Sequence, residues 1–298
     1  MADLKYEVRP MVKEDVPQVL DVWKETGMQE GTHCLYTWLE VDPEGFQVAV
    51  TDSGEILGVC CAIIHHDDLA FIGIYCVRKK HRGLGIGYKV WNACMEHSGT
   101  RNAALNAVPG KLELYRDRGG FPVVESEWVC LVNETHESVH PENLSDIVPD
   151  GVEIQDFHES HLPLIYKYDL HLIGYNRELA LKLNCQEQDS KSFVAIKDGA
   201  CVGFGTIKMS CQEAGQVGPL YANDSSVAEV LLKKLVLSLP QAKGFAMMTI
   251  STNVPANELI KKIGCPMTEE CPRLYRKEKL NVDVSKVFAH FDLNFSPF

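Results

Sequence analysis

The chain of 298 residues carries one sequence pattern twice. Gly54–Val59 matches Gly199–Phe204 in its spacing of glycine and apolar residues, 145 positions further on (199 − 54). Gly120–Pro122 matches Gly264–Pro266 at an offset of 144 (264 − 120). Because a nearly constant register over such a length is typical of duplicated structural units, the sequence predicts two copies of one fold.

Both copies show the same order of predicted elements. A helical stretch leads to a hairpin at Asp-Ser-Gly or Asp-Gly, which is followed by a strand, a helix and closing strands. The matching segments are Val16–Lys24 and His161–Leu172 for the first helix, Phe71–Val77 and Gln216–Ala222 for the strand, and Gly85–His97 and Ser225–Leu239 for the later helix. Hairpin-paired strands that then alternate with helices predict an α/β (α+β) fold, with a mixed, mostly antiparallel twisted sheet flanked by helices in each copy.

The repeat also predicts the domain boundaries. We assign residues 1–135 to the first domain, 136–150 to a linker with prolines and acidic residues, and 151–280 to the second domain. Residues 281–298 match neither copy, and we expect the phenylalanines of this tail to pack back on the body. A duplication within one chain makes a monomer the expected state.

Composition excludes several classes of function. The net charge of −12 argues against nucleic acid or an anionic membrane as the main partner. The longest apolar run, Ile56–Ile64, is too short to span a bilayer, and charged residues stand where a signal peptide needs an apolar stretch. We therefore expect a cytoplasmic protein, with the nucleus left open. The 11 cysteines form no C-x-x-C pair, so they are expected to be reduced, mostly buried, and not metal ligands.

One glycine-rich turn indicates a ligand-binding site. The strand that ends at Val77 runs into the basic stretch Arg78–Arg82 and then into Gly83–Gly87, where a helix begins. Glycines at such a turn let the backbone approach a ligand, and the helix start adds unpaired N–H donors and a partial positive charge. Together they predict an anion site for a phosphorylated ligand in the first copy.

At these residues the chain resembles the GNAT superfamily of N-acetyltransferases. Arg82-x-x-Gly85-x-Gly87 fits the family motif Q/R-x-x-G-x-G/A, and Leu114-Tyr115 followed by Gly120-Phe121 is similar to the family's L-Y-x-x-x-G-F with one residue inserted. The resemblance implies that acetyl-CoA is the cosubstrate, held without a metal. It also implies that Tyr115 protonates the departing thiolate.

The resemblance further implies a set of cofactor contacts. Loop amides would hold the pyrophosphate, the backbone of the preceding strand would pair with the pantetheine arm, and Asn106 is a further candidate. The implied cofactor residues are Tyr75, Cys76, Val77, Arg82, Gly83, Leu84, Gly85, Ile86, Gly87, Tyr88 and Asn106.

The second copy lacks these motifs. Its equivalent loop, Ala222–Val227, has neither glycine nor base, and Asn223, Asp224 or Ser225 is expected to cap the following helix instead. Ile260 stands where the tyrosine would be. This copy is similar to the degenerate C-terminal repeat of tandem GNAT proteins, and we predict that it binds no coenzyme A and instead completes the substrate pocket.

The predicted function is acetyl transfer from acetyl-CoA to a primary amine of an unidentified small molecule. The alternatives are a longer acyl donor, a protein amine as acceptor, or a non-catalytic acyl-CoA-binding or interaction protein. No spacing singles out a general base among Glu25, Glu30 and Glu40. His65–Asp68 could form a metal site or a base, and a polar hairpin tip is the preferred interpretation.

Overall fold

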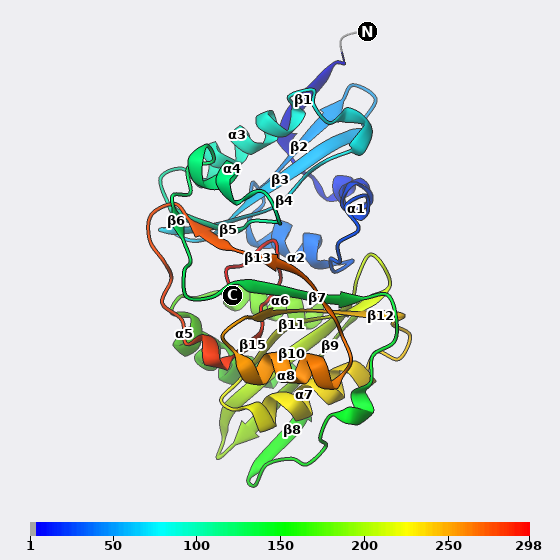
Figure 1. The fold of residues 1–298 in the computed structure, drawn as a ribbon, viewed down its shortest axis with the longest axis vertical. Coiled ribbons are helices and arrows are strands. Elements are labelled where there is room, and N and C mark those ends of the chain that lie inside the picture. Colours follow the sequence, from blue (N-terminus) through cyan, green and yellow to red (C-terminus); the bar gives the residue numbers. More distant parts are fainter. Residues whose placement is uncertain (1–3) are drawn as a thin grey trace.

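The computed structural model describes residues 4–298, and the two halves of the chain lie one above the other in Figure 1. The first half contains strands and helices in the predicted order. They are β1 (Tyr6–Pro10), α1 (Val16–Lys24), α2 (Cys34–Val41), β2 (Phe46–Thr51), β3 (Ile56–His66), β4 (Leu69–Val77), α3 (Ile86–Ser98), β5 (Asn102–Asn106), α4 (Leu112–Asp117), β6 (Val123–Val124) and β7 (Cys130–Thr135).

The second half repeats this order and adds one strand in the tail. Its elements are β8 (Val152–Asp156), α5 (Leu162–Ile173), α6 (Glu178–Gln186), β9 (Ser190–Lys197), β10 (Ala200–Met209), β11 (Ala214–Ala222), α7 (Ser225–Leu237), β12 (Gly244–Ile250), α8 (Val254–Lys262), β13 (Met267–Cys271), β14 (Arg273–Tyr275) and β15 (Val287–Ala289). Short 3₁₀ turns lie at Lys13–Asp15, Lys79–His81, Pro141–Asn143, Glu159–His161 and Val284–Lys286. The duplication and the predicted fold class are confirmed.

Each half builds a mixed sheet, and the two sheets exchange their last strands. The first sheet has the order β1-β2-β3-β4-β5-β14-β6 and the second the order β13-β7-β12-β11-β10-β9-β8. β7, from the first half, is hydrogen-bonded between β12 and β13, and β14, from the second half, lies between β5 and β6. The predicted boundary at residue 135 therefore places β7 with the first domain in sequence, although its backbone hydrogen bonds are made in the other sheet.

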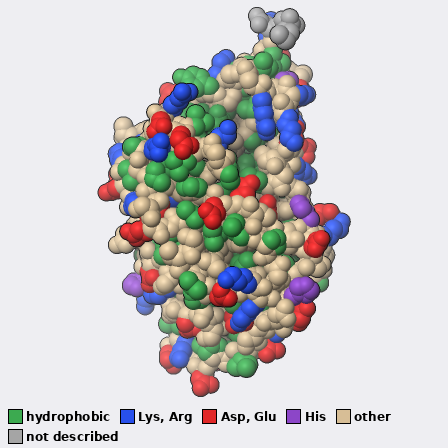
Figure 2. All heavy atoms as spheres, viewed as in Figure 1, with side chains coloured by type: hydrophobic (Ala, Val, Ile, Leu, Met, Phe, Trp, Pro, Cys, Tyr) green, Lys and Arg blue, Asp and Glu red, His purple; other side chains and the backbone are tan. Residues whose placement is uncertain are grey.

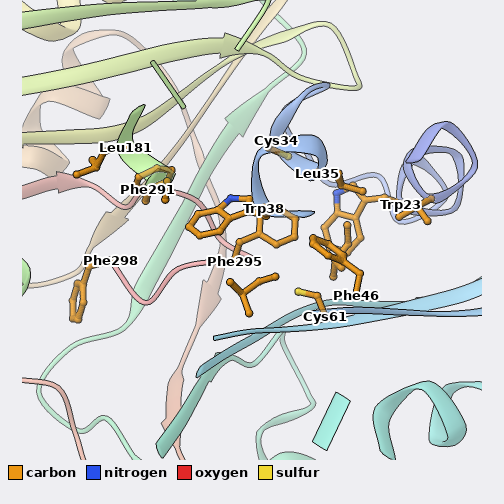
Figure 3. Packing of buried hydrophobic residues seen from close by; sticks show 14 of the residues in the cluster. Trp23, Cys34, Leu35, Trp38, Phe46, Cys61, Leu181, Phe291, Phe295 and Phe298 are labelled. Carbon is orange, nitrogen blue, oxygen red and sulfur yellow. The ribbon is translucent and has the colours of Figure 1, made fainter. Parts of the chain in front are cut away.

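The tail is buried between the halves, as its phenylalanines suggested. Phe288, Phe291, Phe295 and Phe298 are all at most 1% exposed. In Figure 3, Phe295 lies beside Trp38 of α2 and Phe46 of β2, with ring centroids 5.9 and 5.6 Å away. Trp38 also contacts Phe291, at 5.4 Å between centroids. The tail is thus part of the hydrophobic core that joins the two halves.

Buried polar groups fix the course of the tail. Oδ1 of Asp292 accepts hydrogen bonds from the backbone N–H groups of Asn294, Phe295 and Ser296. The Asn294 amide donates to Glu30 Oε2 at 2.6 Å. Burial raises the pKa of Asp292 to about 7, and the nearby Glu30 carboxylate adds to the rise. Because Asp292 Oδ1 and the Asn294 amide are hydrogen-bonded away from water, they fix the position of the tail more specifically than apolar contacts alone would.

Two further expectations can be compared with the fold. All 11 cysteines are free and eight of them are buried, as expected. The hairpin tip is exposed at His66, Asp67 and Asp68, but His65 turns inward, with its Nε2 2.8 Å from the main-chain oxygen of Phe295. Burial lowers the pKa of His65 to about 3. Within residues 4–298, no helix is both long and apolar enough to cross a membrane.

Candidate active site

The site begins where β4 and β5 separate. These parallel strands pair from Leu69 with Asn102 to Ile72 with Leu105, and the pairing then stops. On its other side β4 stays paired with β3, through a bulge between Gly73 and Cys76 in which Ile74 has a φ of 42°. The bulge turns the strand away from β5. The backbone edge of Tyr75–Val77 that faces β5 is therefore free to pair with a ligand.

The glycine turn lies at the end of this open edge. Gly83 and Gly85 have φ values of 82° and 77°, and no atom lies within 4 Å of the position that a Cβ would take at either residue. Gly85 is the N-cap residue of α3, and no side chain caps that helix start. The turn thus presents unblocked backbone N–H groups at a helix N-terminus, which is the arrangement that binds a phosphate.

Part of the basic stretch is neutralised by acidic partners. Arg78 contacts Glu25 at 2.8 Å and Lys80 contacts Glu55 at 2.6 Å. The backbone amide of Lys79 and the Arg78 guanidinium lower the pKa of Glu25. Arg82 instead donates its Nε–H to the carbonyl oxygen of Val77 at 3.0 Å and lines the cavity described below. The formal charge of the stretch is therefore larger than the charge that a ligand would contact. Arg82 is the cationic residue of the stretch that lies at the cavity and can contact a ligand there.

A cavity of about 540 Å³ occupies the space between the separated strands. Its walls come from β4 and β5, from the loop after α1, from β13 of the second half and from the tail. The lining residues include Trp23, Met28, Tyr75, Cys76, Val77, Arg82, Asn106, Lys111, Tyr115, Glu269, Cys271, Leu293 and Asn294. The cavity thus joins the predicted cofactor strand, Arg82, Asn106 and Tyr115 with residues from the other half of the chain.

Tyr115 reaches the cavity despite the inserted residue. The insertion is absorbed after α4, where the N–H of Phe121 returns to the carbonyl of Tyr115 at 3.2 Å and Gly120 has a φ of 83°. The Tyr115 ring packs against Trp91, which in turn packs against Tyr75, with centroids 5.5 and 5.4 Å apart. Burial raises the pKa of Tyr115 well above its usual value. The phenol therefore stays protonated at neutral pH and is able to donate a proton.

The other predicted contacts differ in how they face the cavity. The Asn106 amide is engaged within the protein, since it donates to the Leu293 carbonyl at 3.0 Å and accepts from Arg273 Nε at 2.8 Å. Leu84 and Tyr88 are 55% and 69% exposed, whereas the Ile86 side chain is buried in the core. Gly83, Leu84, Gly85, Ile86, Gly87 and Tyr88 do not border the cavity itself, so their contact with a cofactor stays a prediction that depends on backbone amides.

The equivalent position in the second half is closed. Asp224 caps α7 by accepting from the Val227 N–H at 3.0 Å and from Ser226 Oγ at 2.6 Å, as one of the three predicted caps. Beyond the point where β11 leaves β12, β15 of the tail pairs with β11 at Leu220 and Tyr221. The space that a pantetheine arm would need is filled by the chain itself, which sequence reasoning did not anticipate.

The candidate bases do not line the cavity. Glu25 is held by Arg78, Glu30 is buried against Asn294, and Glu40 borders a different pocket beside His33 and Tyr36. The carboxylate that does line the cavity is Glu269 of β13. Sequence reasoning missed it because nothing in the local sequence says that β13 faces the first half. The strand exchange brings it there.

Comparison with known families agrees with this architecture. The profile described as the acetyltransferase (GNAT) family matches residues 8–119, and the profile described as an acetyltransferase (GNAT) domain matches residues 165–289. The chain belongs to the GNAT superfamily: it carries two GNAT domains in tandem and is an acyltransferase.

Similar proteins of known sequence and structure extend over most of the chain. It is 24% identical over 252 residues to the Holothin acyltransferase of a Pseudoalteromonas species, covering 85% of this chain and 81% of that protein. It is 24% identical to the uncharacterized N-acetyltransferase YitH of Bacillus subtilis, covering 80% of each. A candidate acetyltransferase of Pyrococcus horikoshii superposes with a TM-score of 0.75 at 19% identity, covering 99% of this chain and 98% of that one. A tandem GNAT protein of clavulanic acid biosynthesis superposes with a TM-score of 0.62 at 14% identity, covering 91% and 98%.

Proposed function

We propose that the chain transfers an acetyl group from acetyl-CoA to the primary amine of a small molecule, with the first GNAT domain as the catalytic one. The observation that carries the proposal is that the open edge of β4 and Tyr115 border one cavity, with the glycine turn at the end of that edge. An extended pantetheine arm needs an unpaired strand edge, and a diphosphate needs backbone donors that no side chain obstructs. Both requirements are met in the first half.

Each residue then has a defined role. The backbone of Tyr75, Cys76 and Val77 pairs with the pantetheine arm, and an N–H of the bulged strand stabilises the oxyanion that forms on the thioester carbonyl. Amides from Gly83 to Tyr88 and the Arg82 guanidinium hold the diphosphate. Tyr115 donates a proton to the departing sulfur. These roles follow the family resemblance and are compatible with the walls of the cavity.

The reaction requires the site to remove protons from the acceptor nitrogen and to supply one to the departing sulfur. The acceptor ammonium loses one proton before its nitrogen attacks the thioester carbon, and the new N–C bond forms as the C–S bond breaks. The nitrogen loses a second proton as the sulfur leaves, and Tyr115 passes one proton to that sulfur and regains one from solvent. One proton is released in total. The acceptor side of the thioester therefore needs a proton acceptor, either a carboxylate reached through water or the solvent itself.

Two kinds of support favour a small acceptor. The name of the Pseudoalteromonas relative indicates acyl transfer to holothin, a named compound rather than a protein. The cavity of about 540 Å³ is lined by residues from both halves and from the tail, which suits the reacting end of the cofactor together with a small acceptor. A cytoplasmic location and a monomeric state belong to the same proposal, the latter because each half buries strands of the other.

The test is release of coenzyme A thiol from acetyl-CoA in the presence of phenethylamine, spermidine, glucosamine and a peptide with a free N-terminus. Release with one of the three small amines supports the proposal. Release with the peptide alone would establish a protein acceptor, and tight binding of acetyl-CoA without release would establish a non-catalytic binding protein. We expect Tyr115→Phe to lower kcat by about tenfold or more with little change in acetyl-CoA affinity, whereas Tyr36→Phe, at a tyrosine outside the cavity, keeps the wild-type rate.

A further inference from the structure

The second half contributes a face of its sheet to the cavity. Glu269 and Cys271 of β13 line it, and Cys271 packs with Met28 of the first half and Leu293 of the tail. This places Glu269 on the side of the cavity where the tail closes it. Arg82, by contrast, lies at the end of β4 near the glycine turn. The cavity lining therefore has Arg82 toward the predicted phosphate site, a second cation in Lys111, and an acidic residue toward the second half.

A second carboxylate lies beside Glu269. Glu269 pairs across the strands with Val132 of β7, so the two side chains share one face of the sheet. Glu134 stands two residues beyond Val132 on the same face, at the diagonal distance that long side chains can span. Burial raises the pKa of Glu134, and the nearby Glu269 adds to the rise, against the lowering effect of the Gln29 backbone amide and of His136.

Each of the two carboxylates has one oxygen without a partner in the part of the chain that the structure describes. Glu134 and Glu269 each have one buried oxygen, Oε2, without any hydrogen bond. Other partly buried glutamates are paired: Glu125 contacts Lys279 and Glu229 contacts Lys262, both at 2.7 Å. A carboxylate oxygen taken out of water without a partner is costly. The unpartnered oxygen of Glu269 at the cavity wall, with that of Glu134 beside it, is stabilised when a cation enters the cavity.

A buried donor in the same cavity is also unpartnered. Trp23 lines the cavity and is only 4% exposed, yet its indole N–H makes no hydrogen bond. It lies among apolar cavity residues that include Met28 and Leu293. A ligand that satisfies these groups carries a cationic end for the carboxylates, an apolar body, and a hydrogen-bond acceptor for the indole.

We propose that Glu269 of the second half, with Glu134 of the adjacent strand β7 beside it, binds the ammonium group of the acceptor, and that the acceptor is a compact primary amine with an apolar body held by Trp23, Met28 and Leu293. This inference rests on the proposed acetyl transfer. One carboxylate of the pair takes the first proton of the ammonium before attack and releases it to solvent after the product leaves, so no further reactant is needed. The second sheet, which carries both carboxylates, is thus the part of the enzyme that selects the amine.

The first experiment compares Glu269→Gln and Glu134→Gln with Glu270→Gln as a matched control. Glu270 is the next residue of β13, is exposed, and points to the opposite face. With phenethylamine as acceptor, Glu269→Gln is expected to raise the amine KM by about tenfold or more, a loss of one charged contact. The Kd of acetyl-CoA stays within about twofold, since the phosphate site is elsewhere. Glu270→Gln behaves as wild type in both measurements.

The second experiment measures binding without turnover. Wild-type protein saturated with coenzyme A is titrated with phenethylamine and with the uncharged 2-phenylethanol, while tryptophan fluorescence from Trp23 and Trp91 is followed. The amine is expected to bind about tenfold more tightly than the alcohol, and Glu269→Gln should remove this preference. Because a neutral glutamine replaces an unpaired charge, the variant has no reason to unfold.

The outcomes separate this inference from the proposed function. If Glu269→Gln and Glu134→Gln both keep wild-type amine KM values, or if amine and alcohol bind equally, the ammonium site is refuted even though acetyl transfer stands. If spermidine, glucosamine or the peptide is used far better than phenethylamine, the apolar acceptor class is refuted. If phenethylamine binds through Glu269 but no acceptor releases thiol, the amine site stands and the proposed transfer fails.

Discussion

Gly73 and Gly218 occupy equivalent positions in the two halves, 145 residues apart (218 − 73). In each case a Cβ would collide with main-chain atoms of the tail: Asn294 at Gly73, and His290 and Phe291 at Gly218. Both glycines are needed so that the tail can lie against β4 and β11. Gly73 and Gly218 therefore allow close packing of the tail, whereas Gly83 and Gly85 allow the positive φ angles of the open turn.

Gly85 is the residue whose replacement best tests the predicted phosphate site. Gly85→Ala places a Cβ in open space at a φ of 77°, and Gly54→Ala does the same at 84° in a distant hairpin. We expect each variant to lose about 1 kcal/mol of stability, because an L-residue is strained in the left-handed region. Only Gly85→Ala should weaken coenzyme A binding, by about tenfold in a calorimetric titration. Equal affinity in the two variants would remove the turn from the binding site.

Asp292 predicts a pH dependence of stability. Its pKa is about 7 in the folded chain against an ordinary value of 3.8, so the native state holds more protons than the unfolded state between these values. Stability is then lost as pH rises through this window, by up to about 1.4 kcal/mol per pH unit. Glu25, whose pKa is lowered from 4.5, and the buried His65 act equally in wild type and in a variant of Asp292.

The measurement is urea unfolding of wild type and Asp292→Asn at about pH 5 and about pH 7.5. From the lower to the higher pH, the free energy of unfolding of the variant should rise by about 2 kcal/mol relative to that of wild type. The reason is that the variant has no carboxyl proton to lose at position 292. A difference that does not change with pH would mean that Asp292 is ionised throughout and that the hydrogen bonds from Asn294, Phe295 and Ser296 outweigh its burial.

At the scale of elements, the exchange of β7 and β14 makes the halves interdependent. Without β14, β6 has no partner strand and β5 keeps an open edge; without β7, β12 and β13 are separated. Unpaired edges of this kind lead to aggregation rather than to independent folding. The tail adds to the dependence, since Phe295 packs on Trp38 of the first half and β15 pairs with β11 of the second.

We therefore expect residues 1–150 and residues 151–298, produced separately, to show no cooperative thermal transition. Produced together, the two fragments should associate and recover the circular dichroism spectrum and coenzyme A binding of the intact chain. Cooperative unfolding with coenzyme A binding in the isolated 1–150 fragment would show that the first sheet forms without β14. The intact chain diluted to the same concentration is the control for losses during handling.

At the scale of the whole molecule, the duplication yields one open cavity and one filled groove. The first half leaves the separated edge of β4 accessible, and the second fills the equivalent space with β15. The surface viewed in Figure 2 mixes acidic and basic side chains, with acidic ones at the level where the halves meet. Glu269 of β13, which we propose binds the ammonium group of the acceptor, lines the cavity at this junction.

This arrangement predicts a stoichiometry of one coenzyme A per chain in a calorimetric titration. Asp224→Gly removes the cap that occupies the α7 amides, yet it should leave the stoichiometry at one, because β15 still fills the groove beside β11. A second site appearing in this variant would show that the cap alone closes the second half. A second site in the wild type would contradict the whole assignment of roles to the two domains.

Much of the fold follows from the sequence because its signals are local. Val16–Lys24 was predicted as a helix and is one over the same residues, since an amphipathic repeat with a proline in its first turn specifies a helix without help from the rest of the chain. The glycine turn, the open start of α3 and the Asp224 cap also depend on residues within one or two turns of each other. Tyr115 reaches the cavity for the same reason, as a short loop absorbs the insertion.

The duplication, the element order and the single glycine turn at an uncapped helix start follow from the sequence alone, because backbone propensity and hydrophobic period act over short distances. Only the tertiary structure decided which sheet receives β7 and β14, where the tail lies, and which acid faces the cavity. Partner choice between two similar sheets depends on contacts between residues far apart in sequence. Glu269 and Glu270 are neighbours of the same type, and only the register of β13 against β7 turns one of them toward the cavity.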